Sequence, residues 1–376
     1  MPYTENRCSM LEGLREGYPT ETSLLAQVFN NTTNSYKFLW FLAILSLIQK
    51  RQANPLEMDD VFTEMATIAW HPVCLFHLSL GRQDTFQALV SEIQATSRLP
   101  PKASSKEVRE FVQGASTAKR KLKYFKRHVP TRFLMPWFAS RLSRITDNQR
   151  DRLIPRLAAE SQSTSSPSLY WLENDSIKIN GFWWVFLVKN MGVIQGFAEY
   201  QFTKYLQARN PNVPGVVSKI HAPTDRQLSG ARQFWHFVRV GFERACKSKM
   251  FRDIYSDREL NATFTIDHFL PWSFVTHDLL WNLAPVETTT NSKKGDVLPD
   301  LRLYLPRLAK LHFAALMVAQ KRPKLLEDYT DCFKLDTSAL LALGEKGLLT
   351  KYTEVMVPQT QIAINQGFRS GWMLND

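Results

Sequence analysis

The chain has 376 residues, of which 44% are hydrophobic and 12% aromatic, so it can form two or three packed units and is not intrinsically disordered. Its four cysteines (Cys8, Cys74, Cys246, Cys332) contain no CxxC pair, which favours a reducing compartment and argues against a structural zinc site. No secretory signal is evident and the longest apolar run, Phe38–Ile48, is too short to span a bilayer, so we expect a cytoplasmic protein without membrane attachment.

The positive charge is concentrated in one segment. Between Arg98 and Arg156 there are 16 Lys and Arg against 4 Asp and Glu, which accounts for the whole net charge of +12. Such a segment suits sequence-independent attraction to a phosphate backbone.

The sequence pattern of the first hundred residues predicts helices. A short helix is expected over Glu21–Phe29, a helix that is apolar on nearly all sides over Tyr36–Ile48, and a further helical stretch over Asp59–Leu80 that is interrupted at His71-Pro72. The dipeptide Pro100-Pro101 then marks a boundary.

The middle of the chain alternates helices with turn-rich segments. Basic helices are expected over Lys106–Val112 and Ala115–Lys126, and Tyr124, Phe125, Phe133, Trp137 and Phe138 lie between the charges. Basic residues interleaved with aromatic ones suit nucleic-acid binding, and the alternative is a solvated surface whose aromatics anchor the helices. The serine-rich stretch Ser161–Ser168 predicts a linker or exposed loop, and Gly181–Phe186 predicts either a strand or a buried helix.

Later helices are expected over Phe197–Ala208, Ser229–Lys249, Leu301–Gln320 and Phe333–Lys351, the second of them amphipathic. Between Ser229–Lys249 and Leu301–Gln320 lies the stretch TFTIDHFLPWSFVTHDLLWNLAPVETTTNSKK, residues 263–294. Its alternating start predicts a short strand that ends at Asp267-His268. A second short strand and a helix would bring Asp267, His268, Asn282 and Asn291 to one place.

This stretch resembles the core of the HNH endonucleases, the ββα-metal fold, in the variant whose third signature residue is asparagine. The resemblance rests on several elements in order, namely Asp267-His268, Pro271-Trp272-Ser273, Trp281-Asn282-Leu283, Pro285, Asn291-Ser292-x-Lys294 and Leu298-Pro299. A similar arrangement occurs in the HNH domain of RNA-guided CRISPR nucleases. The likeness is greater to stand-alone bacterial HNH proteins of restriction and anti-phage defence.

The resemblance implies a role for each signature residue. His268 would be the general base that accepts a proton from the attacking water, and Asn282 would orient the site and hold His268. Asp267 and Asn291 would hold one divalent cation, Mg²⁺ or Mn²⁺. Lys293 and Lys294 would contact phosphate. His277 is expected to be structural or substrate-facing.

The expected fold is therefore mainly α, with a helical N-terminal region and flanks around a small ββα-metal nuclease core. The expected domains are a helical region (1–97), a basic nucleic-acid-binding segment (98–160), an aromatic helical region (169–249), the HNH domain (250–320) and a C-terminal helical region (321–376). In the basic segment the candidate DNA contacts are Lys119, Arg120, Lys121, Lys123, Lys126 and Arg127.

The predicted function is metal-dependent endonucleolytic cleavage of DNA. The alternatives are a nucleic-acid-binding adaptor with an inactive HNH core, and a nuclease that is directed to RNA or by a guide. The sequence leaves open the preferred site, nicking against double-strand cleavage, homo-oligomerisation, and the need for a protein partner.

Overall fold

The computed structural model describes residues 22–30, 32–126, 128–223, 226, 228–245 and 251–374, without the side chains of four residues of one helix (116, 117, 119 and 123). These residues form two compact units: unit 1 comprises residues up to Pro211 with Lys219–Pro223, and unit 2 comprises Asn212–Ser218 with Thr224–Asp376. The fold is mainly α, as predicted, and the finer five-part division stays a prediction. Among the described residues, no helix has both the length and the apolar character that crossing a membrane requires.

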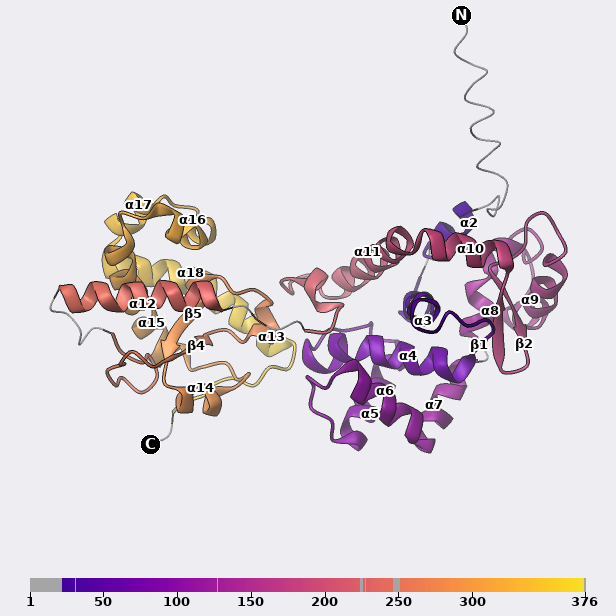
Figure 1. Ribbon diagram of the computed structural model, residues 1–376, viewed down its shortest axis with the longest axis horizontal. Helices are drawn as coiled ribbons and strands as arrows, with labels where there is room; N and C mark the ends of the chain where they lie inside the picture. The colour runs from indigo at the N-terminus through magenta and orange to yellow at the C-terminus, as the bar shows by residue number, and fades with distance from the viewer. Residues whose placement is uncertain are drawn as a thin grey trace, which may run out of the picture. The chain divides into compact units, whose positions relative to one another are not determined.

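Unit 1 is a helical assembly with one small sheet (Figure 1). Its elements are α2 (Thr22–Gln27), α3 (Tyr36–Arg51), β1 (Leu56–Glu57), α4 (Met58–Trp70), the π-helix η1 (His71–Leu75), α5 (Thr85–Ser97), α6 (Ser105–Gly114), α7 (Ser116–Lys126), α8 (Val129–Phe133), η2 (Met135–Phe138), α9 (Asp147–Ser161), β2 (Tyr170–Glu173), β3 (Ser176–Ile179), α10 (Gly181–Lys189) and α11 (Met191–Arg209).

The core of unit 1 is built around α3, whose apolar side chains point in nearly all directions, as the sequence predicts. Trp40, Phe41 and Ile44 have no exposed surface, and the helix packs against α4, α8 and α11. The indole of Trp40 donates a hydrogen bond of 3.0 Å to the hydroxyl of Tyr170 on β2. Helix α3 is thus buried on every side because its neighbours cover all of its apolar surface.

A three-stranded antiparallel sheet with the order β1-β3-β2 was not predicted. β1 pairs with β3, Leu56 opposite Ile177, more than a hundred positions apart in the sequence. β2 pairs with β3, Tyr170 opposite Ile179, and one turn joins these two strands. After the sheet, Gly181–Lys189 is a helix, which decides between the strand and the helix that the sequence left open.

The serine-rich stretch is a turn within unit 1. Its middle, residues 163–165, is exposed as expected of a loop, but Ser168 has no exposed surface and its hydroxyl contacts that of Ser161 at 3.1 Å. The segment therefore joins α9 to β2 tightly and does not separate two domains.

Unit 2 contains the predicted hairpin and a set of helices around it. Its elements are α12 (Ser229–Arg244), β4 (Thr265–His268), α13 (Trp272–Val275), η5 (Leu280–Asn282), β5 (Leu283–Val286), α14 (Thr288–Lys294), α15 (Leu301–Ala319), η6 (Pro323–Leu326), α16 (Glu327–Phe333), α17 (Thr337–Ala342) and α18 (Gly344–Asn365); the 3₁₀ turn η3 (Val216–Lys219) lies at the unit boundary along the chain.

Helices α12, α15 and α18 hold the hairpin in place (Figure 1). Helix α12 contacts β4 and α15, and α15 packs along α18. Beyond α18 the chain returns to the core, where the amide of Leu298 donates to the carbonyl of Arg369 and the amide of Trp372 donates to the carbonyl of Leu298. Ile266, Leu283 and Val286 of the hairpin belong to one buried apolar cluster with residues of α12, α15 and α18, so apolar packing fixes the small hairpin.

Candidate active site

The predicted residues are brought together by β4, β5 and α14. The two strands are antiparallel, with Asp267 opposite Ala284 and His268 opposite Leu283. Helix α14 follows β5 after one residue and contacts β4. The strand–strand–helix order that the sequence predicted is therefore confirmed, and it places Asn291 beside the strand that carries Asp267.

Asn282 fixes the chain that follows His268. Its amide accepts a hydrogen bond from the Leu270 N–H and donates one to the Leu270 carbonyl, both at 2.9 Å. Its own carbonyl accepts from the amide of Phe269 at 2.9 Å. The side chain has no exposed surface and holds the loop after β4, but it makes no hydrogen bond to the His268 ring itself.

The ring of His268 lies between a carboxylate and a guanidinium. Its Nε2 is 2.7 Å from Oδ1 of Asp278, and its Nδ1 is 3.5 Å from Nη1 of Arg226. Because an ionised carboxylate can only accept, the neutral ring places its proton on Nε2 and leaves the lone pair on Nδ1. The residue is only 4% exposed. Its hydrogen bond to Asp278 therefore determines the orientation and the tautomer of the ring.

Asp278 is suited to hold this ring because it stays ionised. The hydrogen bond from His268 lowers the pKa of the Asp278 carboxyl below its usual value of 3.8, although partial burial opposes this. The charges of Arg226 and His277 act in the same direction. At neutral pH the carboxylate is therefore a permanent acceptor for the Nε2 proton.

Asp267 is buried, and both of its oxygens are engaged. Oδ2 accepts a 2.7 Å hydrogen bond from the Tyr255 hydroxyl, and Oδ1 lies 3.2 Å from the ammonium of Lys294. Burial and the neighbouring Asp267 raise the pKa of Tyr255 well above 10.0, so the phenol remains a donor. Lys294 also donates to the carbonyl of His268 at 2.7 Å.

Asp267 and Asn291 would be the oxygen ligands of a divalent cation. Asn291 donates through Nδ2 to the Ile266 carbonyl and to the Thr265 hydroxyl, each at 3.4 Å. Within the described part of the chain, its Oδ1 accepts no hydrogen bond, so an amide oxygen is available on the helix next to β4. No group of three or more His, Cys, Asp or Glu suited to a metal is found among the described residues. Two oxygen ligands from the protein, completed by water and phosphate, match the preference of Mg²⁺.

The two lysines of α14 differ in their environment. Lys293 is exposed, whereas Lys294 is 1% exposed and bound to Asp267 and to the main chain of His268. The ammonium of Lys294 is buried and paired within the protein. It is therefore not presented to a phosphate in the way that the sequence predicted.

The basic segment of unit 1 is partly neutralised by acids from elsewhere in the unit. Lys121 forms an ion pair with Glu92, and Lys126 pairs with Asp59 at 2.8 Å and with Asp175 at 3.5 Å. Arg120 is exposed. The side chains of Lys119 and Lys123, and the whole of Arg127, lie outside the described residues.

Sequence reasoning did not assign three residues of the site: Tyr255, Arg226 and Asp278. Asp278 lies ten positions after His268 and beside His277. The sequence shows an acid at this position, but it does not show that the acid pairs with His268. Arg226 precedes α12, and its guanidinium also lies 5.9 Å from the ring of Trp272. Nothing in the local sequence indicates that these residues face the hairpin.

The hairpin, the following helix and the Asp-His pair at the end of the first strand define a nuclease core of the ββα class. Residues 253–300 match the family model described as HNH endonuclease, so the chain contains an HNH endonuclease domain and with it the core of a nuclease. No curated protein and no solved structure matches the chain.

Proposed function

We propose that this protein is a metal-dependent endonuclease that hydrolyses phosphodiester bonds of DNA, with His268 as the general base. The observation that carries the proposal is the pair between Nε2 of His268 and Asp278, because it leaves Nδ1 as a basic nitrogen next to Arg226. A histidine held in one tautomer near a cationic side chain suits the activation of water beside a phosphate.

In the proposed reaction a water molecule attacks phosphorus while its proton passes to Nδ1 of His268. One P–O bond forms, one ester P–O bond breaks, and the leaving oxygen is protonated by solvent. Arg226 would bind a non-bridging phosphate oxygen, because its guanidinium lies beside the proton-accepting nitrogen. Asn282 keeps the loop of Phe269 and Leu270 fixed, so the ring does not drift from its place.

The cation is proposed to be Mg²⁺ or Mn²⁺, held by Asp267 and Asn291. When bound, it would polarise the phosphate and stabilise the charge that develops on its oxygens. The exposed Lys293 would supply a further contact to phosphate. A role in bacterial restriction or anti-phage defence, beside a protein partner, is part of the proposal and rests on the resemblance alone. The proposed cytoplasmic location rests on the sequence composition.

The decisive experiment is plasmid nicking with purified protein in Mg²⁺ or Mn²⁺, compared with His268→Ala. We expect metal-dependent nicking by the wild type and none by the variant. His236→Ala is the matched control, because His236 is an exposed histidine of unit 2 on α12. If the wild type binds DNA but is inert with both metals, the adaptor with an inactive core replaces this proposal; if it cuts RNA and spares DNA, the RNA-directed alternative does.

A further inference from the structure

Unit 1 contains a pocket whose chemistry differs from that of the hairpin site in unit 2. It has a volume of about 380 Å³, within the range of roughly 300–1,000 Å³ typical of small-molecule sites. It lies between the segment before α3, the start of α5, the end of α7 and the beginning of α8. Its lining combines aromatic, cationic and hydroxyl-bearing side chains: Thr32, Thr33, Asn34, Tyr36, Lys37, Thr85, Tyr124, Phe125, His128, Val129 and Arg132.

One wall of this pocket is aromatic. Tyr124 is 70% exposed, and its ring stands edge-on to that of Phe125 with centroids 5.6 Å apart. Phe125 is buried and packs in turn against the ring of Tyr36 at 5.2 Å. The hydroxyl of Tyr36 is fixed at 2.9 Å from that of Thr85. The wall therefore offers an open ring face on a rigid support, the arrangement on which nucleobases stack.

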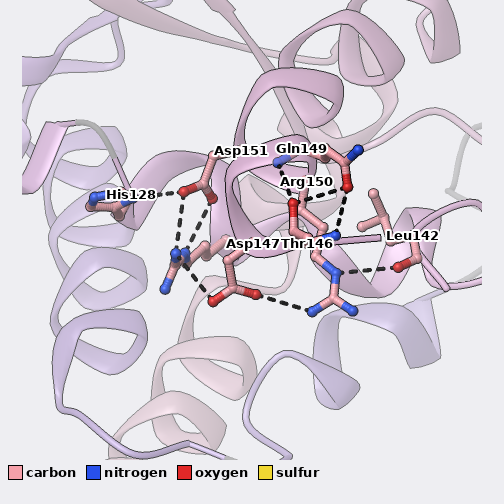
Figure 2. Close-up of polar contacts among 8 residues, drawn as sticks. His128, Leu142, Thr146, Asp147, Gln149, Arg150 and Asp151 are labelled. Atoms are coloured by element: carbon pink, nitrogen blue, oxygen red, sulfur yellow. Dashed lines mark hydrogen bonds and ion pairs between the residues drawn. The ribbon is translucent and has the colours of Figure 1, made fainter. Parts of the chain in front are cut away.

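The cationic part of the lining is held in place by Asp151 of α9. Nε and Nη2 of Arg132 donate to the two oxygens of Asp151 at 3.1 and 3.2 Å, and Nδ1 of His128 lies 2.8 Å from Oδ2 (Figure 2). Burial raises the pKa of Asp151, but the hydrogen bonds from Arg132 and His128 outweigh it and lower the pKa overall. Nη2 of Arg132 also lies 3.6 Å from Oδ2 of Asp147. This bracing fixes the guanidinium and the imidazole, and within the described part of the chain Nη1 of Arg132 and Nε2 of His128 have no hydrogen-bond partner.

The α9 helix that carries Asp151 is itself well anchored. Thr146 and Gln149 form a capping box at its start, and Arg150 bonds Asp147 and the carbonyl of Leu142 (Figure 2). Because the helix start is fixed by three separate contacts, the acid is presented at a constant position. The pocket wall is therefore preorganised before any ligand arrives.

The starts of α3 and α5, which contribute lining residues, are joined to each other. Oδ2 of Asp84 accepts from the amide of Ser35 at 2.7 Å, and its Oδ1 accepts from the amide of Phe86 at 3.0 Å, so one buried acid joins the starts of α3 and α5. Lys37 adds a half-buried ammonium that donates to the carbonyl of Val28 at 3.1 Å. Thr32 and Thr33 add hydroxyl groups to the lining.

We propose that this pocket binds one unpaired nucleotide, with the base stacked on Tyr124 and the phosphate on Arg132. A flat π-face suits a base of any identity, and a braced guanidinium in a pocket that also contains a lysine suits an anionic phosphate. The nucleotide comes either from a single strand of the nucleic acid or from free nucleotide in solution. This inference deepens the proposed action on nucleic acid and rests on it.

The test measures binding without cleavage, in the presence of EDTA. Fluorescein-labelled oligothymidylate, a duplex of equal length and free thymidine monophosphate as competitor are titrated with the full chain. The variants are Tyr124→Leu, which removes the ring, and Tyr124→Phe, which keeps it. Tyr200→Leu is the matched control, because Tyr200 is also an exposed tyrosine of unit 1, 62% exposed, and does not line the pocket.

We expect Tyr124→Leu to weaken oligothymidylate binding by roughly five-fold or more, the scale of losing one stacked base. Tyr124→Phe and Tyr200→Leu should bind like the wild type, and Arg132→Gln should weaken binding as Tyr124→Leu does. Competition by thymidine monophosphate would assign the pocket to a free nucleotide, and its absence would assign it to a strand.

The inference is overturned if Tyr124→Leu binds as tightly as the wild type, or if the wild type binds duplex as tightly as single strand. Cross-linking of oligonucleotides that carry 5-iododeoxyuridine gives an independent reading, because the modified peptide should contain Tyr124 or Tyr36. A protein that fails to nick plasmid yet passes this test would refute the proposed hydrolysis alone, so the two failures are distinguishable.

Discussion

At the scale of single residues, the position of the His268 ring depends on one carboxylate that the HNH signature does not contain. We predict that Asp278→Asn lowers the nicking rate by about 10²-fold, at the lower end of the 10²–10⁴-fold that a positioned general base contributes. The asparagine keeps an acceptor but removes the charge that stabilises the protonated ring. DNA affinity in EDTA should be unchanged, because the substitution alters proton transfer and leaves the phosphate contacts in place.

The rate is measured by plasmid nicking across a range of pH, with Asp331→Asn as the control. Asp331 is an exposed acid on α16 of the same unit. An Asp278→Asn enzyme that nicks at the wild-type rate, while His268→Ala is inactive, would contradict the role assigned to this carboxylate.

Substitutions of the two neighbouring lysines of α14 should have different effects, one on stability and the other on DNA binding. Lys294→Met leaves the buried Asp267 without its cation, so we predict a loss of roughly 3–5 kcal/mol in the free energy of unfolding, the cost of breaking a buried ion pair from one side. Lys293→Met should unfold like the wild type, because that side chain is exposed, and should weaken DNA binding.

Urea unfolding of both variants checks this prediction. The double variant Asp267→Asn with Lys294→Met removes the orphaned charge, so it should recover part of the lost stability. If Lys294→Met alone is as stable as the wild type, the ion pair does not contribute as proposed.

At the scale of elements, α3, α4 and α6 are joined by one buried acid. Glu64 is 2% exposed and accepts from Ser46 at 2.7 Å, from Lys50, and from Arg109 at 3.0 Å. Burial raises its pKa, but the hydrogen bonds from Lys50, Arg109 and Ser46 outweigh this and lower it below the usual 4.5. Because the folded-state pKa is depressed, the stabilisation is present above about pH 4.5 and is lost as the pH falls through the folded-state value.

We therefore predict that Glu64→Gln lowers the free energy of unfolding by roughly 1.5–3 kcal/mol near neutral pH, the scale of a hydrogen bond to a charged group. The difference from the wild type should shrink as the pH falls below about 4.5, because the unfolded chain is protonated there first and the folded acid only at its lower pKa. Thermal unfolding in a pH series measures it, with the exposed Glu57→Gln as control. A difference that stays constant across the series would show that charge plays no part.

The same scale explains what the sequence predicts well and what it does not. The hairpin and α14 lie within thirty residues and are marked by strand alternation and a known signature, so their fold and the grouping of Asp267, His268, Asn282 and Asn291 follow from local pattern. The sheet of unit 1 joins residue 56 to residue 177, and no local pattern specifies such a pairing. The long buried helix over α3 was predictable because apolar residues on all faces leave no solvated side.

Long-range pairing also explains why the sequence did not indicate the partners of some charged residues. The charge of Lys126 is countered by Asp59 and Asp175, which are distant in sequence. Asp278 and Arg226 reach His268 only through the turn after α13 and the segment before α12. A charge count describes a segment, but only tertiary structure decides which charges are left for a partner.

At the scale of the whole molecule, the protein separates two properties between two units. The positive excess of the sequence lies entirely within residues that belong to unit 1, whereas the HNH domain lies in unit 2. Substitutions in the basic segment should therefore change the affinity for nucleic acid and its salt dependence, and substitutions at His268 should change the rate. This division supports an enzyme in which binding of the polyanion and hydrolysis of one bond are supplied by different parts of the chain.

A single HNH domain in the described chain has further consequences for the product. One hairpin with one general base can hydrolyse one bond in one binding event, so we predict nicking. Supercoiled plasmid should convert first to open circles, and linear DNA should appear only later, as second nicks accumulate opposite the first. Because each nick is an independent event of one molecule, the rate of the first step should rise in proportion to protein concentration.

A time course of plasmid cleavage at several protein concentrations measures both features, with His268→Ala as the inactive control. If linear DNA forms at the earliest times without open circles, and its rate rises with the square of protein concentration, two copies of the chain must act together on opposite strands. In that case the proposed chemistry at His268 would stand, because the variant would still be inactive, but the enzyme would work as a homodimer that places one hairpin on each strand.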